Sequence, residues 1–301
     1  MQELVESSWS EDDRSTIRAR LVEDGYVYLP GFLDAVEVQH AAAEIHGALR
    51  RVGWVGDAGD FRPAQKGLAF TSETFGTVYP EVQRLEPLHR LAHTERLLDL
   101  AGEMLLGEVF CHPAKVFRLA SPRASSGFTT QAHQDYVAQM VCSDVLTVWT
   151  PVTTCTPSRQ GIRILPGSHC AGFVPTDATL PGARPLYLNV DADDPRWATA
   201  DFRPGDVVLF HGFTVHGGGP NTSDEFRVSI DVRYQRRDDP MLDTFARPHG
   251  WPRTPDWDVL CDGWSTRRWV ELPPDVHLVA ASLQDIASGD LVPPPSRLLS
   301  R

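Results

Sequence analysis

Apolar residues recur every three or four positions through the first third of the chain, which predicts helices there. Residues 11–25 ("EDDRSTIRARLVEDG") place acidic residues at the start of such a pattern and Gly25 just past its end. After Asp34, a suitable N-cap, the stretch "AVEVQHAAAEIHGALRRV" predicts a long amphipathic helix. A helical pair is expected at about 79–105, where "RLEPLHRLAHTERLLDLAGEML" repeats apolar residues at the same spacing.

The pattern changes after about residue 108, where segments become short, β-branched and aromatic with turns between them. These segments are "EVFCHPAKVFRLA", "DVLTVWTPV", "IRILPGSH", "DVVLFHG" and "FRVSIDVRYQ". Helices first and many short strands afterwards predict a mainly β core with a helical N-terminal layer. We expect one domain over residues 1–301, with a mostly helical layer at 1–107, a β core at 108–236 and a C-terminal extension at 237–301. The tail "LVPPPSRLLSR" is expected to be peripheral.

Composition and charge exclude several classes of protein. Hydrophobic residues make up 42% and charged residues 23% of the chain, as in an ordinary soluble globular protein. The formal net charge is −12 and there is no lysine or arginine cluster, so we expect no nucleic-acid partner. No apolar run is long enough to span a bilayer, and "MQELVESSWSEDD" lacks the features of a signal peptide, so a cytoplasmic location is predicted. The five cysteines are odd in number and lack C-x-x-C spacing, which argues against a disulfide framework or a structural zinc site.

A pair of metal-ligating residue types stands in the stretch "TTQAHQDYVAQ". In an extended segment His133 and Asp135 project to the same side and can reach one ion. Roughly one H-x-D is expected by chance in a chain of this composition, so the pair alone is weak evidence. A third ligand is available from His211 or His216 in "GDVVLFHGFTVHGGGPN". Two histidines and a carboxylate would form a facial triad, which suits ferrous iron in oxygenases; the alternative is a hydrogen-bonded trio in a metal-free fold.

The last predicted strand supplies a test of that hypothesis. In "FRVSIDVRY" the apolar residues fall on one face, and Arg227 and Ser229 fall on the other. A guanidinium fork beside a hydroxyl suits a carboxylate. A dicarboxylic co-substrate that chelates iron at one end needs such an anchor at the other.

With these motifs together, the chain resembles the phytanoyl-CoA dioxygenase family of Fe(II)- and 2-oxoglutarate-dependent oxygenases. The resemblance rests on "LVEDGYVYLPGFLDAVEV", "HQD", "TVWTPV", "IRILPGSH" and "GDVVLFHGFTVHGGGPNTSDEFRVSIDVRY". It implies a double-stranded β-helix (a cupin-like jelly roll) with flanking N-terminal helices, and the use of Fe(II), 2-oxoglutarate and O2. It selects His216 over His211, so that it implies His133, Asp135 and His216 as metal ligands and Arg227 as the anchor of 2-oxoglutarate.

Further candidates surround this group. Co-substrate contacts are predicted for Ser229, Trp149, Gln134 and Lys115. Trp149 and Gln134 are implied by the resemblance, with a core role as the alternative for the tryptophan. Lys115 is one of only two lysines, and its alternative is a strand edge where the stem lies on apolar surface. Candidates for the substrate pocket are Tyr136, Gln139, Arg118, Arg163, Trp197, Trp264 and Trp269, whereas His211 and His169 are expected to be structural.

The resemblance also indicates the reaction. Arg159-Gln160 stand before Gly161 where the family usually has Asn-Gly, which affects a loop but not the metal ligands. Related halogenases have a small residue at the position of Asp135, so this chain resembles the hydroxylating branch. We expect hydroxylation of an unactivated carbon of a small bacterial metabolite, with release of succinate and CO2 and a lid formed by residues 53–75 and 171–200. The alternatives are a metal-dependent cupin-like enzyme that does not use 2-oxoglutarate and a non-catalytic jelly-roll binding protein.

Overall fold

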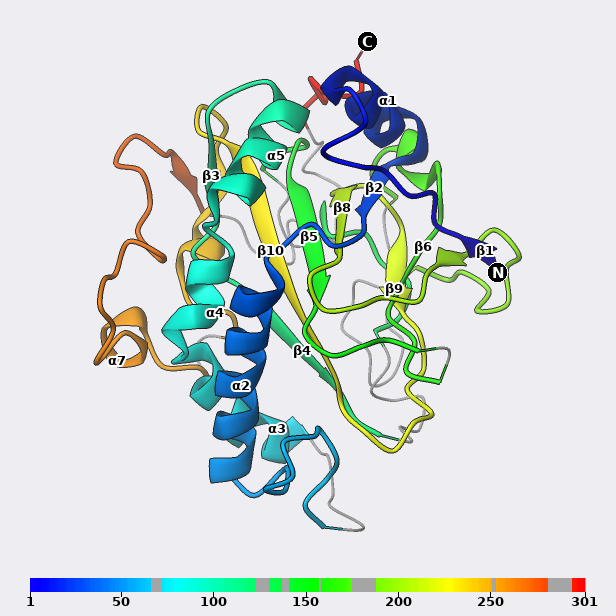
Figure 1. The fold of residues 1–301 in the computed structure, drawn as a ribbon. Coiled ribbons are helices and arrows are strands. Elements are labelled where there is room, and N and C mark those ends of the chain that lie inside the picture. The colour runs from blue at the N-terminus through cyan, green and yellow to red at the C-terminus, as the bar shows by residue number, and fades with distance from the viewer. Residues whose placement is uncertain are drawn as a thin grey trace.

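Two β-sheets face each other, and helices cover the outer side of the larger sheet (Figure 1). The computed structural model describes residues 1–65, 72–122, 130–136, 141–156, 158–174, 188–250, 253–280 and 294–300. In this part of the chain the two sheets do not close into one barrel. The expected fold, a jelly-roll core of the double-stranded β-helix type with flanking helices, is confirmed.

The larger sheet is built around one long strand. Its order is β2 (Tyr26–Leu29), β8 (Val207–His211), β5 (Leu146–Pro151), β10 (Arg227–Arg236) and β3 (Val109–Cys111), and β4 (Val116–Ala120) also pairs with β10. All of these pairs are antiparallel. The central strand therefore has β5 on one side and β4, then β3, on the other.

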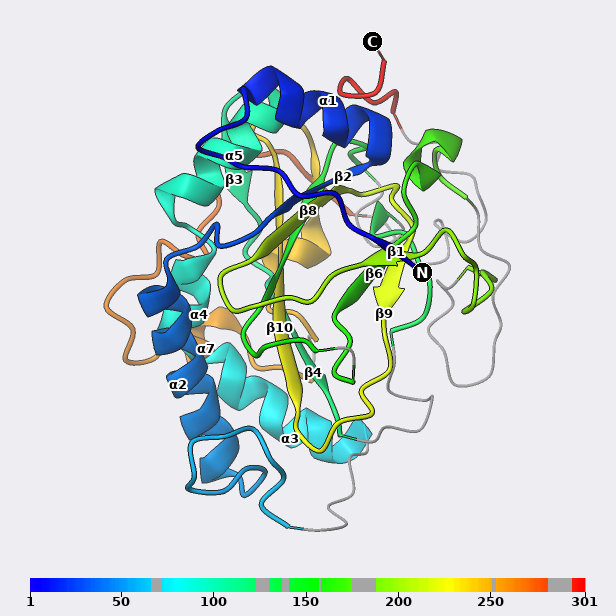
Figure 2. The ribbon, with the colours of Figure 1, turned by 45° about the vertical axis from the view of Figure 1, so that its right-hand side comes forward.

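The smaller sheet is extended at one edge by the segment that contains His133. Its order is β1 (Gln2–Glu3), β7 (Ala198–Thr199), β6 (Ile162–Ile164) and β9 (His216–Gly218). Beyond β9, residues 130–133 continue the sheet through an antiparallel bridge between His133 and His216. A separate parallel pair joins β11 (Met241–Leu242) and β12 (Leu278–Val279). Figure 2 shows β6 and β9 to the right of β10, the long strand of the larger sheet.

The helices are α1 (Arg14–Asp24), α2 (Ala35–Arg51), α3 (Ser72–Gln83), α4 (Glu86–Leu91), α5 (Glu95–Leu105) and α7 (Trp257–Leu260), with the 3-10 turns η2 (Ser168–Ala171) and η3 (Asp243–Ala246). The first two form where the apolar spacing predicts them, whereas the pair expected at about 79–105 is three helices that begin at Ser72, and α7 was not predicted. Asp34 caps α2, since its side chain accepts hydrogen bonds from two backbone N–H groups of the first turn. Gly25 ends α1 at φ 79°, a conformation that favours glycine.

Side-chain alternation along β10 divides the molecule into two environments. Val228, Ile230, Val232 and Tyr234 join a core shared with buried residues of α1 to α5. The alternating residues, from Arg227 to Arg233, are buried on the opposite face between the two sheets. The space between the sheets thus has an apolar part, lined by Tyr26, Tyr28, Trp149, Ile162, Ile164, Phe202, Val208 and Phe210, and a charged part along β10.

The C-terminal tail differs from expectation. Residues 294–300 are not peripheral: Asp144 accepts hydrogen bonds from Ser296 Oγ and from the backbone N–H groups of Arg297 and Leu298. The carboxylate also pairs with Arg236, so a buried charge anchors the tail. The sequence of the tail did not reveal this, because its partner Asp144 lies far away in the sequence.

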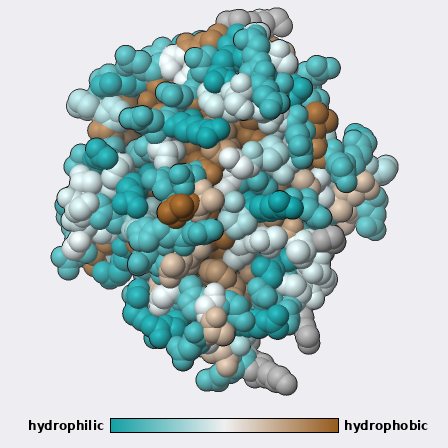
Figure 3. Space-filling view, in the orientation of Figure 1, coloured by the Kyte–Doolittle hydropathy of each residue, from teal (hydrophilic) through white to brown (hydrophobic). Residues whose placement is uncertain are grey.

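Other expectations concern the molecule as a whole. No described helix is long and apolar enough to cross a membrane. The face seen in Figure 3 is mostly hydrophilic, with small scattered hydrophobic areas. The division into a helical layer, a core and an extension stays a prediction. The N-terminal part is not only helical, since β1 belongs to the smaller sheet and β2 to the larger sheet.

Candidate metal and co-substrate site

Three ligand-type side chains converge between the sheets. One nitrogen each of His133 and His216 and one carboxylate oxygen of Asp135 all lie within 4.8 Å of one another. Asp135 Oδ1 is 3.5 Å from His133 Nε2 and 3.7 Å from His216 Nε2. The backbone sets this arrangement, because the N–H of each histidine donates to the carbonyl of the other across the bridge at the sheet edge.

The second nitrogen of each histidine fixes the orientation of its ring. His133 Nδ1 donates to Gln131 O at 2.9 Å and His216 Nδ1 donates to Thr214 O at 3.0 Å. A carbonyl oxygen only accepts, so both rings carry hydrogen at Nδ1 and present the Nε2 lone pair toward Asp135. This is the arrangement in which histidine ligates a metal.

Burial and charge hold two of the three groups, Asp135 and His216, in their ligand forms. Burial disfavours the ionised carboxylate of Asp135, but Arg233 and the two histidines hold its pKa well below the usual value. Burial, together with nearby His133, lowers the pKa of His216 to about 3. A neutral imidazole and an ionised carboxylate are the forms that bind metal. Two imidazoles and one carboxylate fit an octahedral ferrous ion with open positions better than a closed tetrahedral site.

A second feature of the charged face is an arginine, Arg227, which has no carboxylate partner in the part of the chain that the structure describes. Arg227 is 3% exposed, and its Nη1 donates to the carbonyls of Gln160 and Gly161. Among the described residues no carboxylate forms an ion pair with it, and Nε lacks a partner. The hydroxyl of Ser229, two residues along the same face, is also buried without a partner. A buried cation beside an unsatisfied hydroxyl is a site suited to an anion.

The surroundings of Arg227 are shaped to admit the guanidinium. A Cβ at Gly218 would lie 3.2 Å from Arg227 Nη2, tighter than ordinary van der Waals contact. Trp149 lies on the inner face of β5 close to this end, since a Cβ at Gly161 would be 3.1 Å from its ring. The tryptophan packs against Phe202 with ring centroids 4.8 Å apart. Trp149 therefore lies near the Arg227 end of the space between the sheets, and its contact with 2-oxoglutarate stays a prediction.

Arg118 extends the polar lining toward the opening of the site. It lies on β4 opposite Ser229, its Nε donates to Asp231 Oδ2, and its Nη1 donates to Thr130 Oγ1 at 3.2 Å. Its side chain is 25% exposed, unlike that of Asp231 at 4%. Of the predicted substrate contacts, Arg118 is the one that the structure brings to the same face as Arg227.

Two other predicted residues lie elsewhere. Lys115 has the same parity as Phe117 on β4, so it lies on the helix-covered face, where its Nζ donates to Trp269 O. The amide of Gln134 is occupied by backbone groups of Gly172, Val174 and Phe213. We therefore leave Lys115 and Gln134 out of the proposed co-substrate site.

The substrate candidates also separate. Arg163 pairs with Gly217 on the face opposite to His216 and lies over Trp197, with its Nη1 donating to Ala192 O.

The indoles of Trp264 and Trp269 donate to Arg84 O and Glu86 Oε1 in the helical layer, away from the ligands. Tyr136 is buried against Phe173 and Phe213 next to the ligand segment. Gln139, and residues 66–71 and 175–187 of the predicted lid, lie outside the described residues.

His211 and His169, which the sequence analysis expects to be structural, have structural surroundings. His211 accepts from Phe213 N at Nδ1 and faces Asp144 through Nε2 at 3.5 Å. His169 donates to Val22 O, which connects η2 to the end of α1. Neither belongs to the group of metal-ligating atoms.

Two residues at the site were not among the sequence candidates. Thr147 Oγ1 donates to Asp135 Oδ2 at 2.6 Å, and Arg233 Nη2 donates to the same oxygen at 2.8 Å. Strand alternation in the sequence places Arg233 on the same face as Arg227, and Thr147 on the same face as Trp149. Alternation does not show that Arg233 and Thr147 lie side by side, because the sequence does not give the register of β5 on β10.

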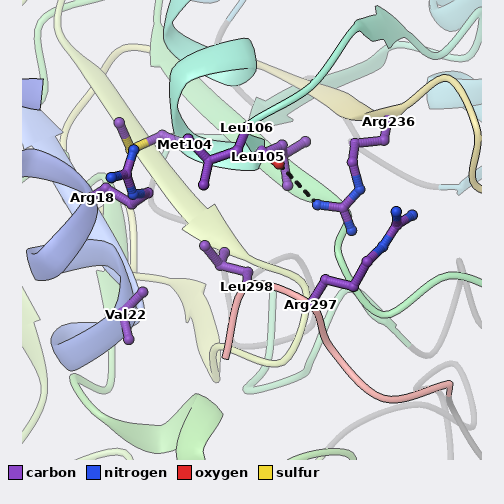
Figure 4. A pocket seen from close by; sticks show the side chains of 8 residues that line it. All are labelled: Arg18, Val22, Met104, Leu105, Leu106, Arg236, Arg297 and Leu298. Carbon is purple, nitrogen blue, oxygen red and sulfur yellow. Dashed lines mark hydrogen bonds between the residues drawn. The ribbon is translucent and has the colours of Figure 1, made fainter. Parts of the chain in front are cut away.

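A separate groove lies between α1, α5 and the C-terminal tail (Figure 4). It is lined by Arg18, Val22, Met104, Leu105, Leu106, Arg236, Arg297 and Leu298. Arg236 donates to Leu105 O and pairs with Asp144, and Arg297 pairs with Asp238 and Asp239. None of the metal-ligating residues lines this groove, so it is distinct from the candidate site.

The chain is similar to known proteins over most of its length. The family model for phytanoyl-CoA dioxygenase (PhyH) matches residues 21–229, which include the histidines, the aspartate, Arg227 and Ser229. A 1-deoxypentalenic acid 11-beta-hydroxylase of Streptomyces arenae is 28% identical over 245 residues, which cover 74% of this chain and 82% of that protein.

Solved structures share the fold at lower identity. The apo non-heme monooxygenase ThoJ is 22% identical, with a TM-score of 0.55 over 74% of this chain and 78% of its own. The epimerase SnoN, solved with Fe3+, alpha-ketoglutarate and a nogalamycin compound, is 23% identical, with a TM-score of 0.54 over 76% of this chain and 85% of its own.

Proposed function

The chain belongs to the phytanoyl-CoA dioxygenase family of Fe(II)- and 2-oxoglutarate-dependent oxygenases, and we propose that it hydroxylates an unactivated carbon of a small bacterial metabolite. In this proposal His133, Asp135 and His216 hold the iron, and Arg227 with Ser229 holds the far carboxylate of 2-oxoglutarate. When bound, iron and 2-oxoglutarate activate O2, and the co-substrate is converted to succinate and CO2 as the substrate is hydroxylated.

The observation that carries the proposal is that Arg227 is buried between the sheets, on the face of the larger sheet that looks toward the ligand group, with no carboxylate partner among the described residues. A cation that is 3% exposed and has only carbonyl partners in that part of the chain is costly to bury. A dicarboxylate that reaches from the ligand group to Arg227 would supply the missing charge. A metal-dependent enzyme without 2-oxoglutarate, or a non-catalytic binding protein, leaves this arginine unexplained.

The residues of the chain contribute orientation and exclusion of water. The carbonyls of Gln131 and Thr214 hold the two imidazoles with Nε2 toward the ligand centre. Trp149 and Phe202 form an apolar wall beside the anchor end. Such walls strengthen the ion pair between a guanidinium and a carboxylate, because little water competes with it.

A small metabolite is the favoured substrate. The Streptomyces relative is named as a hydroxylase of 1-deoxypentalenic acid, a small molecule, and the net charge of −12 gives no extended basic surface for a nucleic acid. Arg118, partly exposed beside the ligand group, is our candidate for a substrate contact. Cytoplasmic action stays a prediction from the sequence.

Anaerobic titration of the protein with Fe(II) and then 2-oxoglutarate tests the proposal. We expect the weak visible charge-transfer band of the iron–keto-acid chelate, and its loss in Asp135→Ala. The absence of the band in folded wild-type protein would contradict the proposal. A screen of candidate metabolites for increased succinate release would then identify the substrate.

A further inference from the structure

The two oxygens of Asp135 have different surroundings. Oδ1 faces the Nε2 atoms of His133 and His216 at 3.5 and 3.7 Å. Oδ2 accepts one hydrogen bond from Thr147 and one from Arg233, at 2.6 and 2.8 Å. A carboxylate oxygen has two in-plane lone pairs, so these bonds occupy both of those on Oδ2.

We propose that Thr147 and Arg233 are positioning residues that restrict Asp135 to binding the metal through a single oxygen. The inference rests on the proposed function and deepens it. Three single-atom ligands leave three positions of an octahedral ion for the co-substrates. A carboxylate bound through both oxygens takes a fourth position, and 2-oxoglutarate and O2 then no longer fit together.

The hydrogen bonds from Thr147 and Arg233 are needed to orient the carboxylate, because the backbone around Asp135 is only partly fixed. His133 is bridged to His216, and Tyr136 N donates to Gly212 O, but residues 133–136 are not part of a regular strand. Thr147 and Arg233, in contrast, are register partners on two central strands of the larger sheet. They are 0% and 3% exposed. The larger sheet thus sets the orientation of a ligand that comes from a segment outside the regular strands.

Arg233 makes this contact with only part of its guanidinium. Nη2 reaches Asp135, and Nε and Nη1 are buried without partners among the described residues. Its contribution to the ligand is therefore one donor and a positive charge. A lysine that reaches Oδ2 supplies both, which makes Arg233→Lys the rescue variant for Arg233→Met.

The same strand offers a matched control for the threonine. Thr150 is 3% exposed on β5, and its hydroxyl donates to Asp206 O at 2.9 Å, remote from Asp135. Thr147→Val and Thr150→Val remove the same hydroxyl with the same change of shape. Only the first removes a donor to the ligand, and Thr147→Ser restores that donor.

The experiment is a Co(II) titration of the apoprotein under anaerobic conditions without 2-oxoglutarate, followed by calorimetry and by the visible d–d spectrum. We expect Thr147→Val to weaken Co(II) binding about tenfold and Arg233→Met about 10- to 100-fold, the range typical of partners of metal ligands. The spectra of both variants should shift toward a different coordination geometry. Thr150→Val should match wild type, and Thr147→Ser and Arg233→Lys should recover most of the affinity.

Wild-type affinity and an unchanged spectrum in Thr147→Val would overturn the inference, as would equal losses in Thr147→Val and Thr150→Val. If Arg233→Met does not fold, the threonine series and Arg233→Lys still decide the question. Failure of the proposed function appears separately, as a missing charge-transfer band in wild-type protein that binds Co(II) normally.

Discussion

Arg227 combines a high cost of burial with a specific use. Its partners in the described chain are carbonyl oxygens, so it has hydrogen bonds but no neutralising charge. Burial lowers its pKa, as expected for a cation that lacks an adjacent anion. Such a residue contributes little to folding and a great deal to the binding of an anion.

Arg227→Ala should raise the KM for 2-oxoglutarate about 10- to 100-fold, because a hydrogen-bonded charge pair contributes roughly 1.5–3 kcal/mol. The measurement is 2-oxoglutarate-dependent succinate formation, with Kd from titration of the chelate band as an independent value. Metal affinity should stay at the wild-type level, since Arg227 does not contact the ligands. A variant that loses metal and co-substrate binding equally would show that Arg227 has only a structural role.

A side chain at Gly218 should weaken 2-oxoglutarate binding, because it would crowd the guanidinium of Arg227. A Cβ there would approach Arg227 Nη2 to 3.2 Å, so Gly218→Ala pushes the fork away from its carbonyl partners. We expect a KM for 2-oxoglutarate raised several-fold, which corresponds to about 1 kcal/mol. Gly47→Ala in α2 is the control, since the nearest atom to its Cβ is the flexible Arg51 side chain at 3.6 Å. Equal effects in both variants would contradict this explanation.

At the residue scale the sequence predicted the types of group better than their partners. The sequence predicts roles for His133, Asp135, His216 and Arg227, and the structure brings the first three together. Choosing His216 over His211 required the resemblance, because both histidines follow the same buried strand. The donors to Asp135 were missed, since they depend on which residues of two strands lie side by side.

At the scale of elements, β10 shows what alternation can and cannot determine. Its period of two correctly separated the residues that pack under the helices from those that face the smaller sheet. The same rule applied to β4 places Lys115 with Phe117 on the helix side. Lys115 is a candidate because lysine is rare in this sequence. Its place is decided by strand alternation, which puts Lys115 on the opposite face of the sheet from Arg118 only if the two differ by an odd number of positions, as they do.

The tail anchor at Asp144 is a second element whose role comes from distant partners. Its carboxylate binds Arg236, Ser296 and two backbone N–H groups of the tail, and it is 2% exposed. Burial would raise the pKa of Asp144, but hydrogen bonds with His211, Ser296 and Arg236 outweigh it and hold the pKa below the usual value. The sequence around it, "VCSDVLTV", gives no sign that residues 150 positions later close over it.

Asp144→Ala should lower the free energy of unfolding by about 3 kcal/mol, because it leaves a buried arginine without its main anionic partner. Urea unfolding followed by circular dichroism measures the change. Asp238→Ala is the matched control: its carboxylate also pairs with Arg236 and Arg297, but it is 69% exposed, and the loss should stay below about 1 kcal/mol. Equal losses in the two variants would show that the tail contributes nothing through Asp144.

For the whole molecule, the buried histidines couple folding to pH. Burial lowers the pKa of His112, which is hydrogen-bonded to Gln235, and of His216 to about 3 each. Burial also lowers the pKa of His89 well below its ordinary value. In the unfolded chain these residues titrate near 6.5, so between about pH 6.5 and 3 the unfolded state binds more protons than the folded state. The free energy of unfolding therefore falls as the pH is lowered through this window.

The size of this effect brings the metal-free protein close to unfolding in mild acid. At pH 5 each such histidine costs about 2 kcal/mol relative to pH 7, so His112 and His216 together remove about 4 kcal/mol from a stability typically of 5–15 kcal/mol. Urea midpoints of the chelator-treated protein at pH 7, 6 and 5 measure the slope. His112→Gln should flatten the slope by about half the contribution of this pair, whereas His40→Gln, which removes an exposed histidine, should not change it. A pH profile that is flat down to pH 5 would contradict the assignment. The low pKa of Asp135 acts in a separate window, since the stability it contributes is complete above about pH 4 and is lost only on further acidification.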